Sequence, residues 1–376
     1  MSKSIVAVVK STPATVLEDV ADAMRKAEYR RFLDPGADTC LKINVTWHLY
    51  MPGTSTTPWQ LEGVIRTLLE DGAKAESLWG VHNDTVVVDS RIGEVNNKQK
   101  PVCDKYGVRR TFLNDPGQEW ILYQPKAPML ALTEVYHKDG IRIPKFLVGK
   151  NIIHLPTVKT HVFTTITGAM KNAFGGLLHF QRHWTHAKIH ETLVDLLRIQ
   201  KDIHPGVFAV TDGIFCGDGP GPRAIRPHIK GYFLASADQV AIDAVSAKLM
   251  GFDPLSIKFI RLAHDAGLGT GDVRDINVVG EDISGINFGF RGNEETFASR
   301  GQKAIYHGPL KPLEKALLQS PIVPWSYAAS RLYHDVYWYP AHGKKRVDEI
   351  LENTDWGRLF RDYEKGLVTR DVPGSN

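Results

Sequence analysis

The architecture of this chain can be inferred from IVAVVKSTPATVLEDVADAMRKAEYRRFLDPGADTCLKINV, residues 5–45. Residues 5–10 and 40–45 are short, mostly apolar runs that are typical of buried strands. Between them, residues 17–32 have the apolar spacing of an amphipathic helix. A strand, a helix and a second strand in this order favour a parallel α/β arrangement.

The same alternation continues along the chain. It predicts a third strand within residues 73–84 and further strands at 151–156, 206–212, 231–236 and 276–280. It predicts helices at 58–71, 239–250 and 255–266. The predicted fold class is therefore α/β, a doubly wound and mainly parallel sheet with helices on both faces.

The composition changes near residue 301, where Trp, Tyr and Pro become frequent. We expect three parts: an α/β core domain over residues 1–300, an aromatic-rich helical extension packed on it over 301–367, and a disordered tail over 368–376. Homo-oligomerisation is left open.

Charge and cysteine usage exclude several classes of protein. The net charge of +4 arises from 46 basic and 42 acidic residues without long runs of one sign, which argues against a nucleic-acid-binding protein. The three cysteines form no CxxC pair, which argues against a zinc ribbon or a built-in iron–sulfur cluster. The N-terminus resembles no signal peptide, and no apolar run approaches the ~20 residues of a membrane helix. We expect a cytoplasmic protein with no membrane partner.

Residues 154–191 contain six of the fifteen histidines. Four of these, His179, His183, His186 and His190, would lie within an arc of roughly 60° on an α-helix. Such a face can bind a divalent transition metal, or it can hold an anion together with Lys159, Lys171 and Arg182. A solvated, weakly basic helix face is the alternative without a ligand.

Ligands of parallel sheets gather at the carboxyl ends of the strands, where polar residues follow several predicted strands here. Asp212 is the first residue of a glycine-rich segment, residues 212–224, which we interpret as a loop that caps a substrate. Its two prolines and its spacing argue against a phosphate-binding loop. Ser236 and Asp238 instead read as caps of the helix that follows them.

Four motifs give the chain a family resemblance. They are a Lys-Thr-His segment, a Thr-Gly-x-x-Lys-Asn-x-x-Gly segment, an Asp-Gly with a Gly-Pro loop, and a Ser-x-Asp-x-Val-Ala-x-Asp helix. In this sequence they fall on Pro156, Lys159, Thr160 and His161; on Thr167, Gly168, Lys171, Asn172 and Gly175; on Asp212, Gly213, Gly219 and Pro220; and on Ser236, Asp238, Val240, Ala241 and Asp243. The chain thereby resembles the family known as domain of unknown function 362 over roughly residues 40–280.

The resemblance implies an α/β fold. Some members of the family carry an appended cysteine-rich iron–sulfur module, which this chain lacks, so no electron transfer through a built-in cluster is implied. The histidines at 179–190 are not a property that the resemblance assigns to the whole family.

The residues themselves point to an enzyme that binds a carboxylate- or phosphate-bearing small molecule over the strand ends. His161, Lys159, Asp212 and Lys171 are the candidate catalytic residues, for proton or redox chemistry with or without a metal. An oxidoreductase or a lyase or isomerase is the expected reaction class. The candidate substrate-binding residues are Asn44, His48, Thr160, Thr164, Thr165, Asn172, Arg182 and Arg223.

Two alternatives belong to other classes of protein. One is a carrier that binds a metal or a cofactor, which the histidine-rich segment would serve. The other is an electron-transfer partner of a separate iron–sulfur protein. For Asn172, a structural role in holding the end of the sheet is as compatible with the sequence as substrate binding.

Overall fold

The structure is a computed structural model, and it describes residues 3–85, 87–292, 294, 300, 305–306, 308, 311 and 324–374. At residues 180–181 and 324–327 only the backbone is described. Gly301, where the C-terminal extension is predicted to begin, lies outside the described residues.

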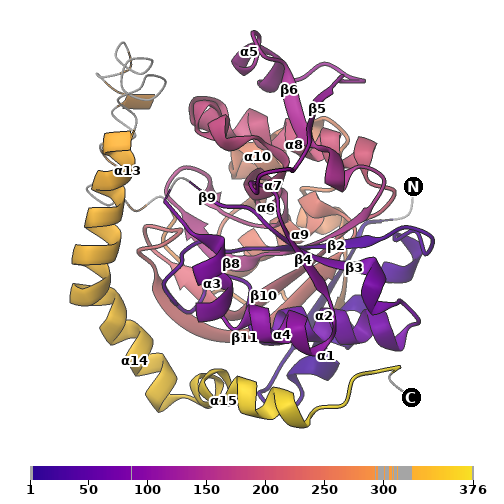
Figure 1. The fold of residues 1–376 in the computed structure, drawn as a ribbon, viewed down its shortest axis with the longest axis vertical. Coiled ribbons are helices and arrows are strands. Elements are labelled where there is room, and N and C mark those ends of the chain that lie inside the picture. The colour runs from indigo at the N-terminus through magenta and orange to yellow at the C-terminus, as the bar shows by residue number, and fades with distance from the viewer. Residues whose placement is uncertain are drawn as a thin grey trace.

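A twisted sheet forms the centre of the molecule (Figure 1). Its path is β12-β1-β11-β10-β7-β2-β3-β4, with β8 and β9 attached beside β10, and β5 and β6 form a separate hairpin. The strands are β1 Ile5–Lys10, β2 Thr39–Ile43, β3 Leu78–His82, β4 Arg109–Phe112, β5 Trp120–Tyr123, β6 Ile141–Pro144, β7 Asn151–Leu155, β8 Thr157–His161, β9 Thr165–Ile166, β10 Val207–Asp218, β11 Arg226–Ser236 and β12 Asn277–Gly280.

Helices cover both faces of this sheet, and each face has its own apolar core. One core is formed with α6 Ala169–Asn172, α7 Phe174–Leu177, α8 Ile189–Ile203, α9 Gln239–Met250 and α10 Lys258–Asp265. The other is formed with α1 Val16–Lys26, α2 Pro58–Glu70, α4 Gln99–Lys105 and α15 Asp355–Thr369.

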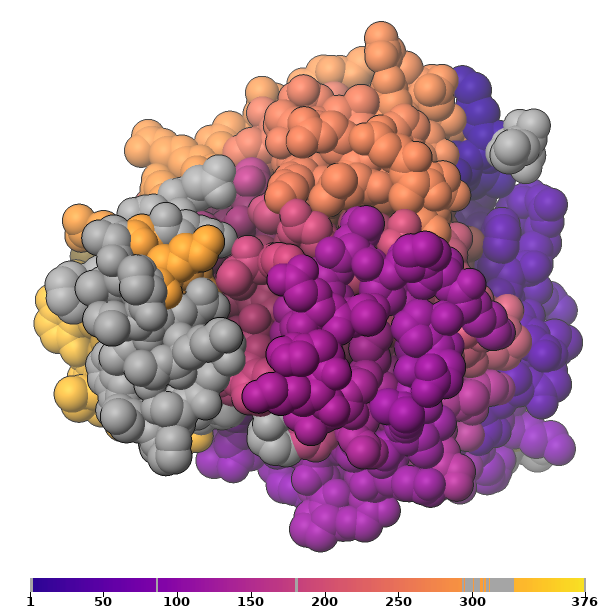
Figure 2. All heavy atoms as spheres, turned by 90° about the horizontal axis from the view of Figure 1, so that it is seen from above, coloured from indigo at the N-terminus to yellow at the C-terminus, as the bar shows by residue number. Residues whose placement is uncertain are grey.

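Shorter or peripheral helices complete the described chain. They are α3 Ser90–Asn96, α5 Leu132–Val135, α13 Pro324–Arg331, α14 Lys344–Asn353, the 3₁₀ helices η1 Tyr29–Arg31, η2 Ala75–Ser77, η3 Lys145–Leu147, η4 Phe180–Lys188, η5 Pro254–Ser256 and η6 Val273–Asp275, and the π-helix η8 Leu332–Gly343. In the view from above, the β5–β6 hairpin and α5 occupy the front of the molecule (Figure 2, purple). No helix within the described ranges is long and apolar enough to cross a membrane.

The predicted fold class, a mainly parallel α/β sheet with helices on both faces, is confirmed. Strands β10, β7, β2, β3 and β4 run parallel, whereas β11 is antiparallel to both β1 and β10. No prediction was made for β4, β5 and β6, which are short and separated by polar segments. The helix predicted at 17–32 ends at Lys26, because Glu28 adopts a left-handed conformation (φ 54°) that breaks the helix before η1.

The prediction of a glycine-rich loop at 212–224 is wrong for its first half. Strand β10 continues to Asp218 and pairs with β11 through the register Asp218↔Arg226, so residues 212–218 belong to a long hairpin. The backbone groups of these residues are satisfied by a strand that is distant in sequence, which local composition does not reveal. Only the turn between the two strands retains the proline-rich loop character.

We call α13, η8 and α14 the C-terminal arm. The arm runs along the outside of the core and leads into α15, which lies against α4 (Figure 1). Tyr363 and Arg370 both donate hydrogen bonds to the buried carboxylate of Glu62 on α2. Helix α15 ends at Thr369, so it overlaps the start of the tail predicted at 368–376 by two residues.

Removing the Tyr363 hydroxyl tests how strongly α15 is fixed to the core. We expect Tyr363→Phe to lower the free energy of unfolding by about 1.5–3 kcal/mol, since hydrogen bonds to charged groups contribute on this scale. Urea unfolding measures the change. Tyr337→Phe is the matched control, because the Tyr337 ring is exposed. Equal stability of the two variants would show that the Glu62 contact does not hold the helix.

Candidate functional site

The site lies where the direction of the chain through the sheet reverses. From β2 the chain continues to β3 and β4 on one side, and it returns at β7 on the other side of β2. The carboxyl ends of β2 and β7 therefore flank a topological switch point, where ligands of open α/β sheets bind. Lys42 on β2 and His154 on β7 are register partners at this point, so their side chains lie on the same face.

Five basic side chains gather on this face, and we call them the basic site. Lys42 is supplied by β2, His161 by the end of β8, Lys171 by α6, and Arg182 and His186 by η4. Ring contacts place three of them together, because His161 and His186 both lie beside the ring of Phe163, and Lys171 and His186 both lie beside the ring of Phe174. The charge of Arg182 also lowers the pKa of Lys42 and that of Lys171.

Burial and mutual repulsion disfavour the charged forms of these groups. Burial, with a contribution from Arg182, lowers the pKa of Lys42 to about 7 and that of Lys171 to about 8. Burial lowers the pKa of Arg182 to about 10. Burial, followed by the charge of Lys171, lowers the pKa of His186 to about 3 and holds that of His161 well below its ordinary value. Both histidines are therefore neutral near pH 7.

The cluster lacks ion pairs within the described residues, and the nearby Asp84 carboxylate only partly offsets the effect of burial on Arg182. Among the described residues, Lys42, Lys171 and Arg182 form no ion pair. Arg182 donates from Nη2 to the main-chain oxygen of Asp84 at 2.8 Å, and its Nη1 is buried without a hydrogen-bond partner. The Asp84 carboxylate is engaged elsewhere, because its Oδ1 accepts from the amide and the hydroxyl of Ser90. Buried positive charge without a counter-charge is costly, and an anionic ligand would remove that cost.

Two neutral side chains beside the basic site also lack partners within the described part of the chain. Both amide atoms of Asn83 are buried and form no hydrogen bond to any residue that the structure describes, and the same holds for the buried hydroxyl of Tyr136. Asn83 directly precedes Asp84, whose carbonyl binds Arg182. The Tyr136 ring lies 6.4 Å from the ring of Trp184 on η4, the helix that also carries Arg182. Such orphaned groups are rare in folded proteins and are consistent with contacts to a ligand.

The two neutral histidines of the basic site differ in which ring nitrogen carries the proton. Nδ1 of His161 accepts from the amide of Phe163 at 3.1 Å, so the proton of the neutral ring lies on Nε2. Nδ1 of His186 lies 3.0 Å from the carbonyl of His183 and donates to it, which leaves its Nε2 as an acceptor. One ring thus offers a donor and the other an acceptor.

Other predicted site residues near these strands serve the scaffold. The buried ammonium of Lys159 donates to the Thr54 carbonyl at 2.9 Å and to the Thr157 hydroxyl at 2.7 Å. Asn172 donates to the Lys42 carbonyl at 2.9 Å and lies 3.3 Å from Nδ1 of His154, which favours the structural role that the sequence left open.

Asn44, Thr160 and Thr164 bind main-chain carbonyl groups. Asn44 donates to the Thr54 carbonyl, Thr160 to the Gly219 carbonyl, and Thr164 to the Ile166 carbonyl. Thr165 adopts a left-handed conformation (φ 65°) in β9. These side chains shape the loops around the basic site.

Asp212 does not join His161 and Lys159, although all three were predicted to act together. Its side chain lies on the face of the sheet opposite Lys42, as does that of Val210 two residues earlier, because side chains alternate along a strand. There its carboxylate accepts from Thr57, from Trp59 at 3.0 Å and from the amide of Ile214 at 2.6 Å. Burial raises its pKa to about 6. Asp212 therefore serves the core on that face.

His48 and Arg223, which were predicted to bind a substrate, contact the C-terminal arm and not the basic site. Nε2 of His48 lies 3.3 Å from the carboxylate of Asp335, and Arg223 donates to the Ser330 hydroxyl at 2.9 Å.

The predicted helical stripe of four histidines does not form. His179 precedes η4, His183 and His186 lie within this 3₁₀ helix, and His190 lies on α8. A 3₁₀ helix has three residues per turn, so spacings of four and seven no longer place the rings on one face. Within the described ranges, no three His, Cys, Asp or Glu side chains are arranged to hold a metal ion.

Lys42, Asn83 and Tyr136 are residues of this site that sequence reasoning missed. The signal for Lys42 was a lone lysine inside the apolar strand CLKINV, and the signal for Asn83 was its place directly after a strand. Tyr136 had no signal, because the segment around α5 reaches the site only in the folded chain.

The last family motif explains how Lys171 is positioned. Asp243 on α9 is buried and accepts from the amides of Ala169 at 2.6 Å and Met170 at 3.0 Å. Gly168 precedes these amides with φ 101°, and a Cβ there would lie 2.3 Å from the Asp243 carboxylate. This contact fixes the first turn of α6, which carries Lys171.

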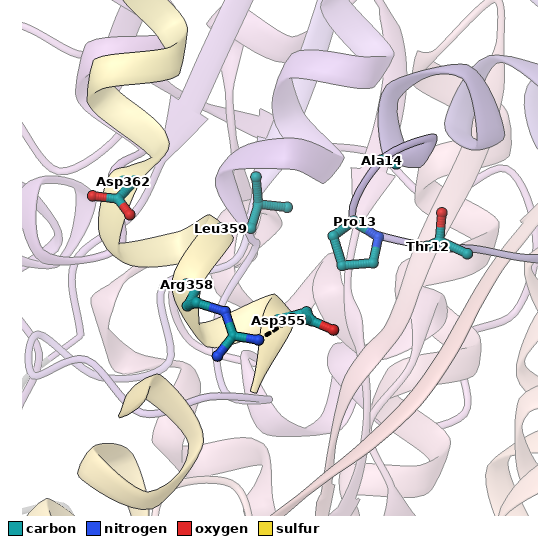
Figure 3. A pocket seen from close by; sticks show the side chains of 7 residues that line it. All are labelled: Thr12, Pro13, Ala14, Asp355, Arg358, Leu359 and Asp362. Carbon is teal, nitrogen blue, oxygen red and sulfur yellow. Dashed lines mark hydrogen bonds and ion pairs between the residues drawn. The ribbon is translucent and has the colours of Figure 1, made fainter. Parts of the chain in front are cut away.

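A separate surface pocket lies between α15 and the segment that follows β1 (Figure 3). Its lining includes an exposed ion pair between Arg358 and Asp355, and it contains no buried polar group without a partner. It is lined by Thr12, Pro13, Ala14, Asp355, Arg358, Leu359 and Asp362. Its chemistry is that of an ordinary surface.

The charge state of Lys42 provides a test of the basic site. The pKa of Lys42 is about 7 in the folded chain and about 10.4 in the unfolded chain. Between these two pH values the unfolded chain binds one more proton than the folded chain. The contribution of Lys42 to the free energy of unfolding therefore rises with pH. We expect Lys42→Met to be more stable than wild type near pH 7 and to lose this advantage towards pH 10, at about 1.4 kcal/mol per pK unit.

Urea unfolding at several pH values measures this difference. Lys138→Met is the control, because Lys138 is exposed and should follow the wild-type curve. An advantage of Lys42→Met that does not change with pH would contradict the assigned pKa.

Comparison with known proteins identifies the family of the chain. Residues 39–248 match the family model described as Domain of unknown function (DUF362). The thylakoid-associated protein sll1697 of Synechocystis sp. is 31% identical over 124 residues, which cover 31% of this chain and only 37% of that protein. No solved structure matches the chain. Because the matched residues make up more than half of the sequence, the chain belongs to the domain of unknown function 362 family.

Proposed function

We propose that this protein binds a small anion, carrying carboxylate or phosphate groups, at the basic site and transfers a proton to or from it. The observation that carries the proposal is the buried cluster of Lys42, Lys171 and Arg182, which has no ion pair within the described residues. A carboxylate or phosphate accepts hydrogen bonds from arginine and lysine together, and such charge-assisted bonds are short and strong.

Asn83 and Tyr136 extend this recognition. The Asn83 amide supplies both a donor and an acceptor, and the Tyr136 hydroxyl supplies a further donor. A ligand that pairs with these groups must carry polar atoms beyond one carboxylate or phosphate oxygen. We infer a polar organic acid or phosphate ester, bound with its charge towards Arg182.

The histidines supply the proposed proton chemistry. Neutral His186 can accept a proton at Nε2, whereas neutral His161 offers a hydrogen-bond donor at Nε2 and can act as a proton donor only once it has become an imidazolium. Bound negative charge favours the imidazolium form, so ligand binding moves both pKa values up towards the neutral range where general acids and bases are effective. Proton abstraction and return fit a lyase or isomerase, and they also fit the proton steps of an oxidoreductase.

The proposal also includes the cellular compartment in which the protein acts. We infer action in the cytoplasm, supported by three cysteines that are all free and buried. The name of the relative places that protein at thylakoids, and the shared segment covers 37% of it. A cytoplasmic protein that lies against a membrane surface agrees with both observations.

Sulfate is a suitable probe of anion binding because it stays dianionic across the relevant pH range. We expect sulfate to raise the unfolding temperature of the wild type, with about 2.7 kcal/mol of stabilisation at one hundred times its Kd. Arg182→Met and Lys171→Met should lose this effect, whereas Lys138→Met should keep it. Equal sulfate stabilisation of Arg182→Met and wild type would exclude the basic site as the anion site.

The affinity for sulfate should also depend on pH in a defined direction. Lys42 and Lys171 have pKa values of about 7 and about 8 without an anion, and a bound anion raises both. Binding then takes up protons, so the affinity should fall as pH rises from about 7 to 9, by up to about tenfold per pH unit for one linked proton. Calorimetric titration at several pH values measures this. An affinity that is independent of pH would contradict the linkage.

Proton transfer is tested by isotope exchange. We expect at least one member of a panel of carboxylates and phosphate esters to exchange a carbon-bound proton in deuterium oxide, as followed by NMR. His161→Gln and His186→Gln should slow the exchange about 10²–10⁴-fold, the usual contribution of a general acid or base. His137→Gln is the control, since His137 is an exposed residue at the end of α5. Exchange at the wild-type rate in both site variants would exclude the assigned histidines.

A further inference from the structure

The side-chain amide of Asn83 requires two kinds of hydrogen-bond partner. Asn83 is 7% exposed, and neither its Oδ1 nor its Nδ2 forms a hydrogen bond with any residue that the structure describes. An amide has an acceptor oxygen and a donor nitrogen, so both needs exist whichever way the group is turned. The oxygens of a carboxylate or phosphate can accept from Nδ2, but they cannot donate to Oδ1. A ligand that satisfies Asn83 must therefore carry a hydrogen-bond donor as well as anionic oxygens.

Arg182 approaches the segment of Asn83 from η4. Its Nη2 donates to the carbonyl of the next residue, Asp84, at 2.8 Å. Its Nη1 is buried and has no hydrogen-bond partner within the described ranges, so it does not donate to Oδ1 of Asn83. The guanidinium needs an acceptor and the amide oxygen needs a donor. A ligand that serves both carries a charged group and a donor close to each other.

Lys42 lies at the same edge of the sheet. In the parallel pair of β2 and β3, Lys42 is the register partner of Val81, two residues before Asn83. The two strands end one residue later, at Ile43 and His82. Neighbouring strands lie about 4.8 Å apart. A small molecule at this edge can therefore contact both Lys42 and Asn83.

The number of cations favours a ligand with two negative charges. The basic site contains Lys42, Lys171 and Arg182, and the Asp84 carboxylate only partly offsets the effect of burial on Arg182. A monoanion neutralises one of these three cations, whereas a dianion neutralises two. Each added pair of ionised groups forms strong charge-assisted hydrogen bonds. A dianion should therefore bind more tightly than a monoanion of the same size.

We propose that the ligand of the basic site is a dianion with a hydroxyl group next to its charged groups, an assignment that rests on the proposed anion site. The hydroxyl donates to Oδ1 of Asn83, and an anionic oxygen accepts from Nδ2. The hydroxyl of Tyr136, which is 7% exposed and has no partner in the described part of the chain, can bind a further oxygen. A hydroxyl is favoured over an ammonium group as the donor, because an ammonium group would add positive charge to a cluster of cations.

Matched pairs of ligands test the hydroxyl group. Malate is succinate with one hydroxyl added, and glycerol 3-phosphate is propyl phosphate with two. In calorimetric titration we expect the wild type to bind the hydroxylated member of at least one pair about tenfold more tightly, since an unpaired buried amide costs affinity on this scale. The pair that shows the preference identifies the anion as a carboxylate or a phosphate. Equal affinities within both pairs would overturn the proposal.

Asn83→Leu tests the residue that is assigned to the hydroxyl. The variant removes both amide atoms, so the two members of the preferred pair should bind within about twofold of each other. Asn353→Leu is the matched control, because Asn353 is exposed on α14, and it should keep the tenfold preference. A preference that persists in Asn83→Leu would overturn the role of Asn83. The comparison of ligands on the wild type does not depend on the folding of this variant.

Butyrate tests the charge of the ligand, because it has the chain length of succinate and one carboxylate fewer. We expect butyrate to bind to the wild type at least about tenfold more weakly than succinate. Equal affinity for the two would overturn the assignment of a dianion. Binding of sulfate and succinate without a preference for malate or glycerol 3-phosphate would overturn the hydroxyl and leave the anion site in place. Failure of every anion to bind, sulfate included, would overturn both.

Discussion

Uncompensated positive charge at the carboxyl ends of β2 and β7 is the constraint on which the interpretation of this protein depends. Lys42 and Arg182 are buried there, and the sheet offers them carbonyl oxygens without a carboxylate. A lysine in such a place loses its proton more readily than it would in water, as the pKa of Lys42 shows. The scaffold therefore holds the site in a state that an anion would stabilise.

The buried acids of the chain are engaged elsewhere, and this keeps the site cationic. Asp243 accepts from the first amides of α6, and Asp195 accepts from the amides of residues 130–132 next to α5. Asp212 holds the start of the hairpin on the opposite face, and Glu62 binds α15. Two of these carboxylates fix the segments that carry Lys171 and Tyr136, so they contribute to the site by position and without neutralising its charge.

The sequence predicted those features that depend on local pattern. Apolar periodicity identified most strands of the central sheet, and the density of basic and histidine residues singled out the segment 154–191, which contains His161, Lys171 and Arg182. Contacts between segments that are distant in sequence could not be predicted from these local patterns. The pairing of β10 with β11 converted an apparent loop into a hairpin, and strand alternation placed Asp212 on the face opposite Lys42.

The histidine stripe shows a second kind of limit. Its prediction assumed 3.6 residues per turn, whereas η4 has the tighter 3₁₀ geometry. Phe, His, Trp and Thr are weak helix formers and fill much of this segment, so tertiary contacts decide its conformation. One such contact is the stacking of His186 on Tyr306, a residue 120 positions further along the chain.

The basic site and the C-terminal arm meet at one loop. Residues 44–57 follow Lys42 on β2, and within this loop Trp47 and Tyr50 hold the inner face of the arm while Thr54 binds Lys159. A change on the inner face of the arm would therefore disturb the loop that leads from Lys42, so the position of the arm and the geometry of the basic site depend on the same residues.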